Sequence, residues 1–248
     1  MHKPIEVTKD VFYVGVNDRT KHLFENLWAL PQGVSYNSYI IEDEKTVLID
    51  AVDICYSDVF SRRIRSVLGD KPIDYLVINH MEPDHTGAVE WLVSRYPNIQ
   101  IVGNKRTLEM LNGFYGIANN VILVEDLGEL SIGKNRLQFF LTPMVHWPET
   151  MMTYVPEKKV LFSGDAFGAF GALNGGVLDS QLRPERYGDE MIRYYSNIVG
   201  KFGSPVQTAL KKLEGVEIGA ICSTHGPVWT VPENISKVVD LYDRLSRY

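Results

Sequence analysis

The sequence predicts an α/β protein with four layers, in which two β-sheets pack face to face and helices cover both outer faces. A strand-rich stretch followed by strand–helix units is succeeded by a second strand-rich stretch followed by helices, so the chain has a two-fold order. In addition, two pairs of apolar runs are separated only by the short polar loops 42–45 and 156–159, which is typical of antiparallel hairpins. A doubly wound parallel sheet is the alternative, and the two hairpins disfavour it.

Short runs of apolar residues bounded by Gly, Pro and polar residues predict the strands. These runs are residues 11–16, 36–41, 46–49, 74–78, 99–102, 120–124, 137–141, 151–155, 160–162 and 218–222.

Helical periodicity predicts helices at 57–68, 88–96, 105–115, 189–202, 204–213 and 232–247. Ser57 is a candidate N-cap residue of the first of these helices, and Gly116 is expected to end the third. Ser204 followed by Pro205 predicts an N-cap residue and a proline at the first helical position of the fifth.

Length and composition predict one globular domain over residues 1–248. A hydrophobic content of 45% in 248 residues is enough for a sizeable core, which excludes a disordered chain, and two cysteines are too few for a disulfide framework. The formal net charge of −6 argues against nucleic acid or an anionic membrane as a partner. Because no apolar run approaches the roughly 18 residues of a membrane span, we expect a cytoplasmic protein.

A dense group of potential metal ligands follows the predicted strand 74–78. Within six residues the chain carries His80, Glu82, Asp84 and His85. The same residue types stand just beyond the ends of three other apolar runs, as His146, Asp165 and His225. Since strand ends that share one edge of a sheet converge, these segments are expected to meet in one cleft.

Four imidazoles and three carboxylates are too many ligands for one tetrahedral ion. They suit two metal ions with one carboxylate between them, and Asp165 is the best candidate for that bridge. A ligand set without thiolates suits iron or manganese as well as zinc, so the residues alone leave the metal open.

The pattern His80-x-Glu82-x-Asp84-His85, followed by His146, Asp165 and His225, resembles the metallo-β-lactamase superfamily, and its details resemble the diiron domain of the flavodiiron proteins. Supporting stretches are 33–39, 144–151, 165–168 and 223–226, and the likeness covers essentially the whole chain. Hydrolases of the superfamily usually carry His where this chain has Glu82, so Glu82 is the specific signal.

The resemblance implies two iron ions joined by an oxo or hydroxo bridge. His80, Glu82 and His146 would bind one ion, and Asp84, His85 and His225 the other, with Asp165 bridging them. In some family members the counterpart of His85 swings away from the metal. An added carboxylate at position 82 stabilises the higher oxidation state of the metal, which favours redox chemistry over hydrolysis.

Family members of this type reduce dioxygen, nitric oxide or both. The resemblance implies electrons from a separate flavodoxin- or rubredoxin-type donor and a head-to-tail homodimer. The chain has no phosphate-binding loop for a flavin, so we expect that it does not bind FMN. Two other functions remain open, which are an oxygen-binding sensor without turnover and a zinc-dependent hydrolase.

Aromatic and polar residues near the predicted ligands are candidates for the walls of a gas pocket. A tyrosine hydroxyl there could hydrogen-bond a bound gas molecule, which makes Tyr194 and Tyr195 candidate catalytic residues. The candidate pocket residues are His22, Phe24, Glu25, Trp147 and Phe167. Relatives often carry His where this chain has Glu25, which leaves any preference between the two gases open.

Overall fold

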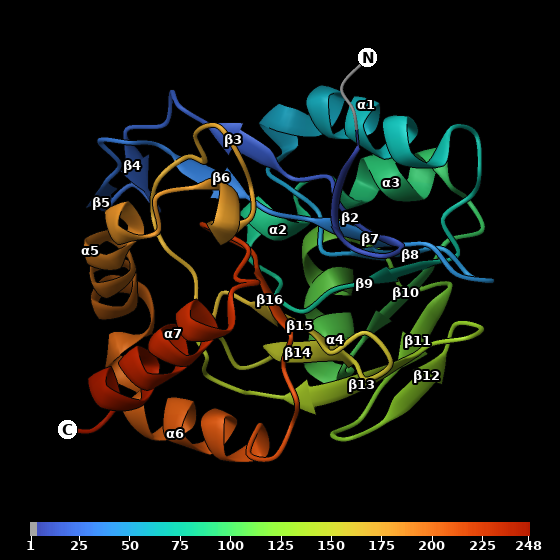
Figure 1. Cartoon of the computed structure of the whole chain (residues 1–248). Helices are drawn as coiled ribbons and strands as arrows, with labels where there is room; N and C mark the ends of the chain where they lie inside the picture. Colours follow the sequence, from blue (N-terminus) through green and yellow to red (C-terminus); the bar gives the residue numbers. More distant parts are fainter. Residues whose placement is uncertain (1–3) are drawn as a thin grey trace.

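The computed structural model describes residues 4–248, so the first three residues of the predicted domain lie outside the described part. Its core is built from two main sheets of seven and five strands. In Figure 1 the strands lie between helices α1 and α3 at the top and helices α6 and α7 at the lower left. This arrangement agrees with the predicted sandwich.

The seven-stranded sheet runs in the order β1-β2-β7-β8-β9-β10-β11 and mixes strand directions. The neighbouring strands β1, β2, β7 and β8 pair antiparallel. From β8 onward, through β9, β10 and β11, the strands pair parallel. Because the predicted hairpin of β7 and β8 is antiparallel, the doubly wound alternative is wrong. The strand bounds are Ile5–Thr8 (β1), Val11–Tyr13 (β2), Tyr39–Ile41 (β7), Val47–Ile49 (β8), Tyr75–Val77 (β9), Gln100–Gly103 (β10) and Val121–Leu123 (β11).

The five-stranded sheet has the order β12-β13-β14-β15-β16, and the second predicted hairpin is its antiparallel pair β14 and β15. Only β15 and β16 pair parallel. The bounds are Glu129–Ser131 (β12), Arg136–Leu141 (β13), Met151–Val155 (β14), Val160–Gly164 (β15) and Ala220–Ser223 (β16). Two small sheets, β3 (Val16–Asp18) with β6 (Val34–Tyr36) and β4 (Leu23–Phe24) with β5 (Trp28–Ala29), flank the main ones.

The faces of the two main sheets meet in the core. The ring of Tyr39 on β7 packs against that of Phe162 on β15, with centroids 5.3 Å apart. The Tyr39 hydroxyl also donates a hydrogen bond of 2.7 Å to the backbone oxygen of Ser223 on β16. Burial of apolar side chains between the sheets is the main source of stability in such a layered fold.

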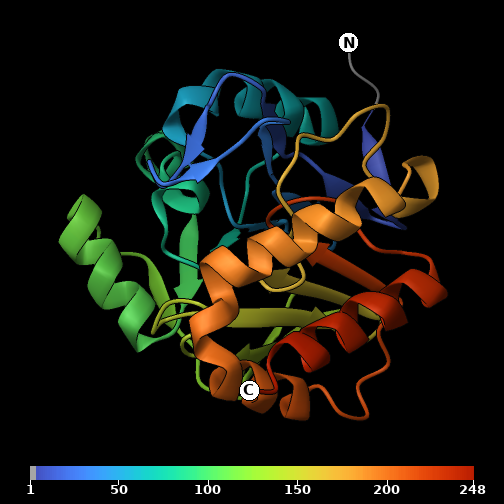
Figure 2. The ribbon, with the colours of Figure 1, turned by 90° about the vertical axis from the view of Figure 1, so that its left-hand side faces the viewer.

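Helices cover the outer faces through apolar stripes. The stripe of α1 consists of Phe60, Ile64 and Leu68, spaced four residues apart. Helix α4 contacts strands β10 and β11, and α6 contacts β13. Figure 2 shows α5, α6 and α7 grouped on one side of the molecule. The bounds are Ser57–Leu68 (α1), Pro83–Thr86 (α2), Val89–Arg95 (α3), Lys105–Tyr115 (α4), Glu185–Tyr194 (α5), Gly203–Lys212 (α6) and Pro232–Leu245 (α7).

Several predicted boundaries are wrong. Neither Ser57 nor Ser204 caps a helix, because a 3₁₀ turn precedes α1 and the chain is already helical when it reaches Ser204. The expected helix 189–202 begins earlier, at Glu185, and changes to a π-helical turn at Tyr195. The expected strand 36–41 is divided between β6 and β7, since Asn37 turns away to bond the opposite sheet through its side chain.

No helix in the described residues is both long and apolar enough to cross a membrane.

Candidate metal centre

The seven predicted ligands lie on segments that follow strands of both sheets. His80 stands three residues after β9, Asp165 directly after β15 and His225 two residues after β16, while His146 lies in the turn between β13 and β14. The strand ends therefore bring side chains from distant parts of the sequence to one edge of the sandwich, as their positions predicted.

The loop after β9 divides its ligands between two sides. Glu82 has an extended backbone and directly precedes α2, and Pro83 occupies the first helical position, where its missing N–H is not needed. Asp84 and His85 lie within that short helix. The change from extended chain to helix sends Glu82 into one group of side chains and Asp84 with His85 into another.

These groups are compact enough to bind metal. His80, Glu82, His146 and Asp165 form one, and Asp84, His85 and His225 form the other, and within each group the potential ligand atoms lie within 4.8 Å of one another. The Nε2 atoms of His80 and His146 are each 3.3 Å from Glu82 Oε2. Ligand atoms held at bonds of about 2.0–2.2 Å in tetrahedral geometry are separated by roughly this distance.

Asp165 connects the two groups through its two carboxylate oxygens. Its Oδ2 lies 3.1 Å from His146 Nε2, whereas its Oδ1 lies 2.9 Å from His85 Nε2. The hydroxyl of Thr224 donates a 2.5 Å hydrogen bond to Oδ1 and fixes the carboxylate in this orientation. Asp165 is thus placed where a bridging ligand would have to be.

Hydrogen bonds on the far sides of two imidazoles direct their Nε2 atoms into the centre. His80 Nδ1 is 2.7 Å from Glu149 Oε1, and His225 Nδ1 is 2.7 Å from the backbone oxygen of Ser35. If each Nδ1 carries the proton that these acceptors need, each Nε2 is free to bind a metal.

Several buried polar atoms in the centre have no hydrogen-bond partner among the described residues. They are both carboxylate oxygens of Asp84, Nε2 of His225 and Nδ1 of His85. All seven predicted ligands are at most 6% exposed. Buried polar groups are normally paired, so unpartnered ligand-type atoms that converge on one place fit a metal centre.

The electrostatics of the centre show how crowded its charges are. Burial, together with the nearby charges of Glu82 and Asp165, raises the pKa of Asp84 to about 7 despite the opposing effect of His85. Although burial favours the neutral form of Asp165, His85, His146 and His80 hold its pKa well below the usual value. The Asp84 carboxyl group thus resists ionisation beside the ionised carboxylate of Asp165, and a divalent cation would relieve that conflict.

Aromatic side chains surround the centre, as predicted for three residues. The ring of Phe24 packs edge-on against His225 at 5.3 Å, and Tyr194 lies 5.5 Å from the same imidazole. The Trp147 ring stands 5.1 Å from that of His80. Burial, with a further contribution from the Asp165 charge, raises the pKa of Tyr194 well above its usual value, so its hydroxyl keeps its proton.

Tyr195 and Phe167 do not share this position. Both rings pack against Tyr242 on α7, at 5.0 and 4.7 Å between centroids. Tyr195 follows Tyr194 on the same helical segment, and consecutive helical side chains point in directions about 100° apart. Tyr194 packs against the ligand His225, whereas Tyr195 packs against Tyr242 in the C-terminal core, so the structure does not place Tyr195 in the predicted catalytic position.

The predicted pocket residues His22 and Glu25 lie at the exposed hairpin of β4 and β5. Partial burial and the neighbouring Glu82 carboxylate raise the pKa of Glu25 to about 7, which places Glu25 beside the centre. His22 is exposed at the start of this hairpin, and its predicted place in a pocket stays a prediction.

Sequence reasoning missed two buried carboxylates that support the ligands. Glu149 accepts hydrogen bonds from His80 and from the Met81 backbone N–H. Asp50, directly after β8, accepts from the backbone and side-chain N–H groups of Asn79, the residue before His80. Asp50 stands in the sequence without a ligand-like spacing. Glu149 lies in the stretch 144–151 that carries the family resemblance, but nothing in the sequence links it to His80, which is 69 positions away.

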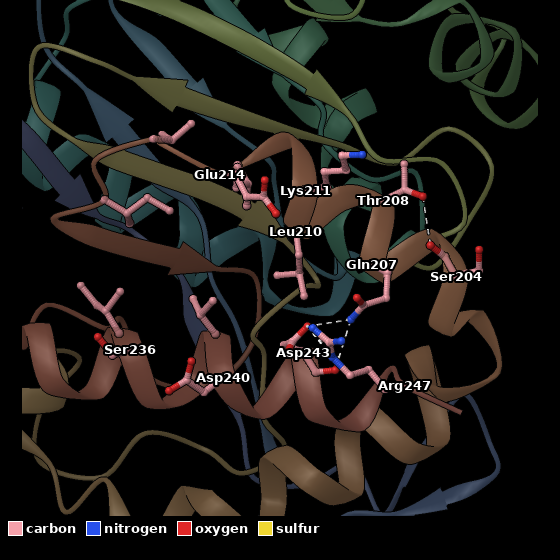
Figure 3. Close-up of a pocket in the computed structure, with 15 residues that line it drawn as sticks. Ser204, Gln207, Thr208, Leu210, Lys211, Glu214, Ser236, Asp240, Asp243 and Arg247 are labelled. Atoms are coloured by element: carbon pink, nitrogen blue, oxygen red, sulfur yellow. Dashed lines mark hydrogen bonds and ion pairs between the residues drawn. The ribbon is translucent and has the colours of Figure 1, made fainter.

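A separate groove of about 730 Å³ lies between α6 and α7. Figure 3 shows Asp243 on α7 accepting hydrogen bonds from Gln207 on α6 and from Arg247, just after α7, so the two helices are linked at the groove. None of the predicted ligands lines it. The groove is therefore distinct from the buried centre, which remains the candidate functional site.

Comparison with protein families gives a match over most of the chain. A family described as "ODP family beta lactamase" matches residues 34–226. The chain is 30% identical to a nitric oxide reductase of Moorella thermoacetica over 98% of its own length and 61% of that protein.

Solved structures give the same result. The flavodiiron protein of Giardia intestinalis superimposes with a TM-score of 0.93 at 32% identity, over 99% of this chain and 60% of that one. Rubredoxin:oxygen oxidoreductase of Desulfovibrio gigas gives a TM-score of 0.94 at 30% identity, over 98% and 61%. The metallo-β-lactamase-like fold is thus confirmed, and the chain spans about 60% of these relatives' length.

Proposed function

Because the chain belongs to the ODP family of β-lactamase-like domains, the domain family of the flavodiiron proteins, we propose that it is a diiron oxidoreductase domain. It reduces dioxygen, nitric oxide or both. The relatives named above are a nitric oxide reductase and an oxygen oxidoreductase, which supports this class of substrate.

The observation that carries the proposal is the position of Glu82 inside the centre. Glu82 lies against His80 and His146, where the related hydrolases usually have a third histidine. A carboxylate adds negative charge to the metal and stabilises its oxidised state. With three carboxylates, four imidazoles and no thiolate, the ligand set suits iron.

In this proposal His80, Glu82 and His146 would hold one iron, Asp84, His85 and His225 would hold the other, and Asp165 would be shared between them. Two ferrous ions would supply the electrons for the reaction. The reduction of two nitric oxide molecules to nitrous oxide and water needs two electrons and two protons. The reduction of dioxygen to two water molecules needs four electrons and four protons, so a donor must supply more.

The surrounding residues bind and orient the gas molecule. Phe24 and Trp147 form apolar walls beside the ligands His225 and His80 and exclude water from the centre. The Tyr194 hydroxyl is buried, protonated and without a partner among the described residues, so it is free to donate a hydrogen bond to a substrate oxygen.

Electrons come from a separate flavodoxin- or rubredoxin-type protein, as the name of the Desulfovibrio relative suggests. Residues 1–248 form one domain that does not itself hold FMN, and the domain works in the cytoplasm as a head-to-tail homodimer.

The test is metal analysis of protein produced without added metal, followed by anaerobic assays of dioxygen and nitric oxide consumption with a reduced donor. We expect two irons per chain and consumption of at least one gas. A stable oxygen adduct without turnover would instead support an oxygen sensor. Zinc alone, with ester hydrolysis that is lost in His146→Ala, would support a hydrolase.

A further inference from the structure

We propose that Glu149 is a positioning residue that makes the two metal positions unequal, so that the position formed by His80, Glu82 and His146 binds metal more tightly than the other. The inference rests on the proposed function for the presence of two metal ions. It does not depend on which gas is reduced.

Glu149 fixes the orientation of His80 through one oxygen. Its Oε1 lies 2.7 Å from His80 Nδ1 and accepts a second hydrogen bond of 2.9 Å from the Met81 backbone N–H. His80 Nε2 then points at Glu82 Oε2, 3.3 Å away. The carboxylate thus holds both the imidazole and the start of the loop that carries Glu82.

The backbone of Glu149 is fixed as well. Its carbonyl oxygen accepts a 2.5 Å hydrogen bond from the side chain of Asn104, the residue that caps the N-terminus of α4. Two residues later, Met151 N–H donates to the backbone oxygen of Asn79. Glu149 is therefore held between the ends of the two sheets and is not free to adjust its distance to His80.

The burial of Glu149 is costly unless its charge has a use. The residue is 1% exposed, and its second oxygen, Oε2, has no hydrogen-bond partner among the described residues. Burying a carboxylate with one unpartnered oxygen disfavours folding. One neutral amide oxygen at the position of Oε1 would satisfy the same two N–H groups, so folding alone does not explain the carboxylate.

The imidazole of His225, in the other group of ligands, has a neutral hydrogen-bond acceptor behind it and not a carboxylate. His225 Nδ1 faces the neutral backbone oxygen of Ser35, at the same 2.7 Å distance as the charged oxygen behind His80. A carboxylate behind an imidazole makes it a more basic ligand than a carbonyl does. The two Nδ1 hydrogen bonds have the same length, but only the acceptor behind His80 is charged. We therefore expect the metal position that contains His80 to bind metal more tightly than the one that contains His225.

The test is metal binding by Glu149→Gln, which keeps the shape and one acceptor oxygen but removes the charge. Purified metal-free protein is titrated with zinc alone and, anaerobically, with ferrous iron alone, in competition with a chelator of known affinity. We expect the tighter of the two binding steps to weaken about 10- to 100-fold and the weaker step to change little. Glu90→Gln, at an exposed site on α3, is the matched control.

A spectroscopic measurement separates charge from a general loss of structure. In protein loaded with iron-57, Mössbauer spectra should show that one of two iron signals shifts in Glu149→Gln while the other stays. Glu149→Asp, which restores the charge on a shorter side chain, should recover part of the affinity. If Glu149→Gln does not fold, Glu149→Asp tests the placement of the carboxylate, because the shorter side chain draws it back from His80 Nδ1. The tighter binding step should then weaken while the weaker step stays, and two unchanged steps would overturn the inference.

Two results would overturn the inference. One is wild-type protein that binds both ions with equal affinity, and the other is Glu149→Gln with both binding steps unchanged. Failure of the proposed function looks different, since the wild type would then consume neither gas although Glu149→Gln still weakened one binding step.

Discussion

Tyr194 and Tyr195 are neighbours in the chain, and both have buried hydroxyl groups without a hydrogen-bond partner among the described residues. Tyr194 faces His225, whereas Tyr195 faces Tyr242. We expect Tyr194→Phe to lower gas turnover about ten- to a hundred-fold, because it removes a hydrogen-bond donor from the reacting molecule. Steady-state assays with dioxygen and nitric oxide measure this effect.

Tyr195→Phe is the matched control and should leave turnover unchanged. Both substitutions remove an unpartnered buried hydroxyl, so both should keep the free energy of unfolding the same or raise it by about 1 kcal/mol. Equal losses of turnover in the two variants would contradict the placement of Tyr194 beside the substrate.

Among single residues, the sequence predicts the metal ligands better than the residues that hydrogen-bond to those ligands. Four of the ligands lie within residues 80–85, and the other three each follow the end of an apolar run. They were recognisable because metal binding requires particular residue types, and all seven lie together in the structure. Glu149 stands in the stretch that carried the family resemblance, but its contact with His80 spans 69 positions. A hydrogen bond of that range leaves no pattern in one sequence.

At the scale of elements, α4 offers two glycines with opposite expected effects. Gly116 ends the helix in the left-handed conformation, with φ of 66°, whereas Gly113 lies inside the helix with open space around it. Gly116→Ala should lower the free energy of unfolding by about 1 kcal/mol, because alanine is strained at positive φ. Gly113→Ala should raise it by about 0.5–1 kcal/mol through helix propensity.

Urea denaturation of the two variants, loaded with the same metal, measures both effects. Equal effects of the same sign would contradict the helix end at Gly116. Neither residue contacts the metal centre, so metal content should match the wild type in both.

The elements that the sequence predicted well are those with strong local signals. The helix ended by Gly116 has its predicted bounds, and α7 begins at Pro232 as expected. The predicted serine caps are wrong because a 3₁₀ turn precedes each helix, Ile54–Tyr56 before α1 and Gly200–Phe202 before α6. The two-residue strands β4 and β5 were missed, since so short a hairpin has no periodicity to read.

At the scale of the whole molecule, metal and protons compete for the same buried groups. In the metal-free protein the Asp84 carboxyl has a pKa of about 7, and the charges of Asp84 and Asp165 outweigh burial and raise the pKa of His85 to about 9. Unfolded, these groups titrate near 3.9 and 6.5. At these two groups the folded state binds protons more tightly than the unfolded state, so the stability that they contribute to the metal-free protein is lost as pH rises from about 4 through 9.

Metal-loaded protein should not show this loss, because the cations replace the protons. We expect chelation to lower the melting temperature, and the difference in melting temperature between loaded and chelated protein to grow between pH 5 and pH 9. Thermal unfolding at several pH values measures it. A difference that is constant or shrinks with pH would show that Asp84 and His85 do not change their protonation when metal binds.

The four-layer architecture was predictable from the sequence, because hairpins and the two-fold order of elements are local patterns. The way in which the two sheets come together around the metal centre was not predictable. It depends on bonds between the sheets, such as that from the Tyr39 hydroxyl to the Ser223 carbonyl oxygen, which join residues 184 positions apart. The same closure places ligands from both sheets around Asp165.

The central claim is that these ligands hold two redox-active irons. The most direct measurement is a single turnover without any donor protein, in which iron-loaded, chemically reduced protein is mixed anaerobically with nitric oxide and, separately, with a limited amount of dioxygen. The account predicts two irons per chain and oxidation of both as at least one gas is reduced. A chain that contains two irons and leaves both gases unreduced, or a centre that takes up only zinc, would contradict it.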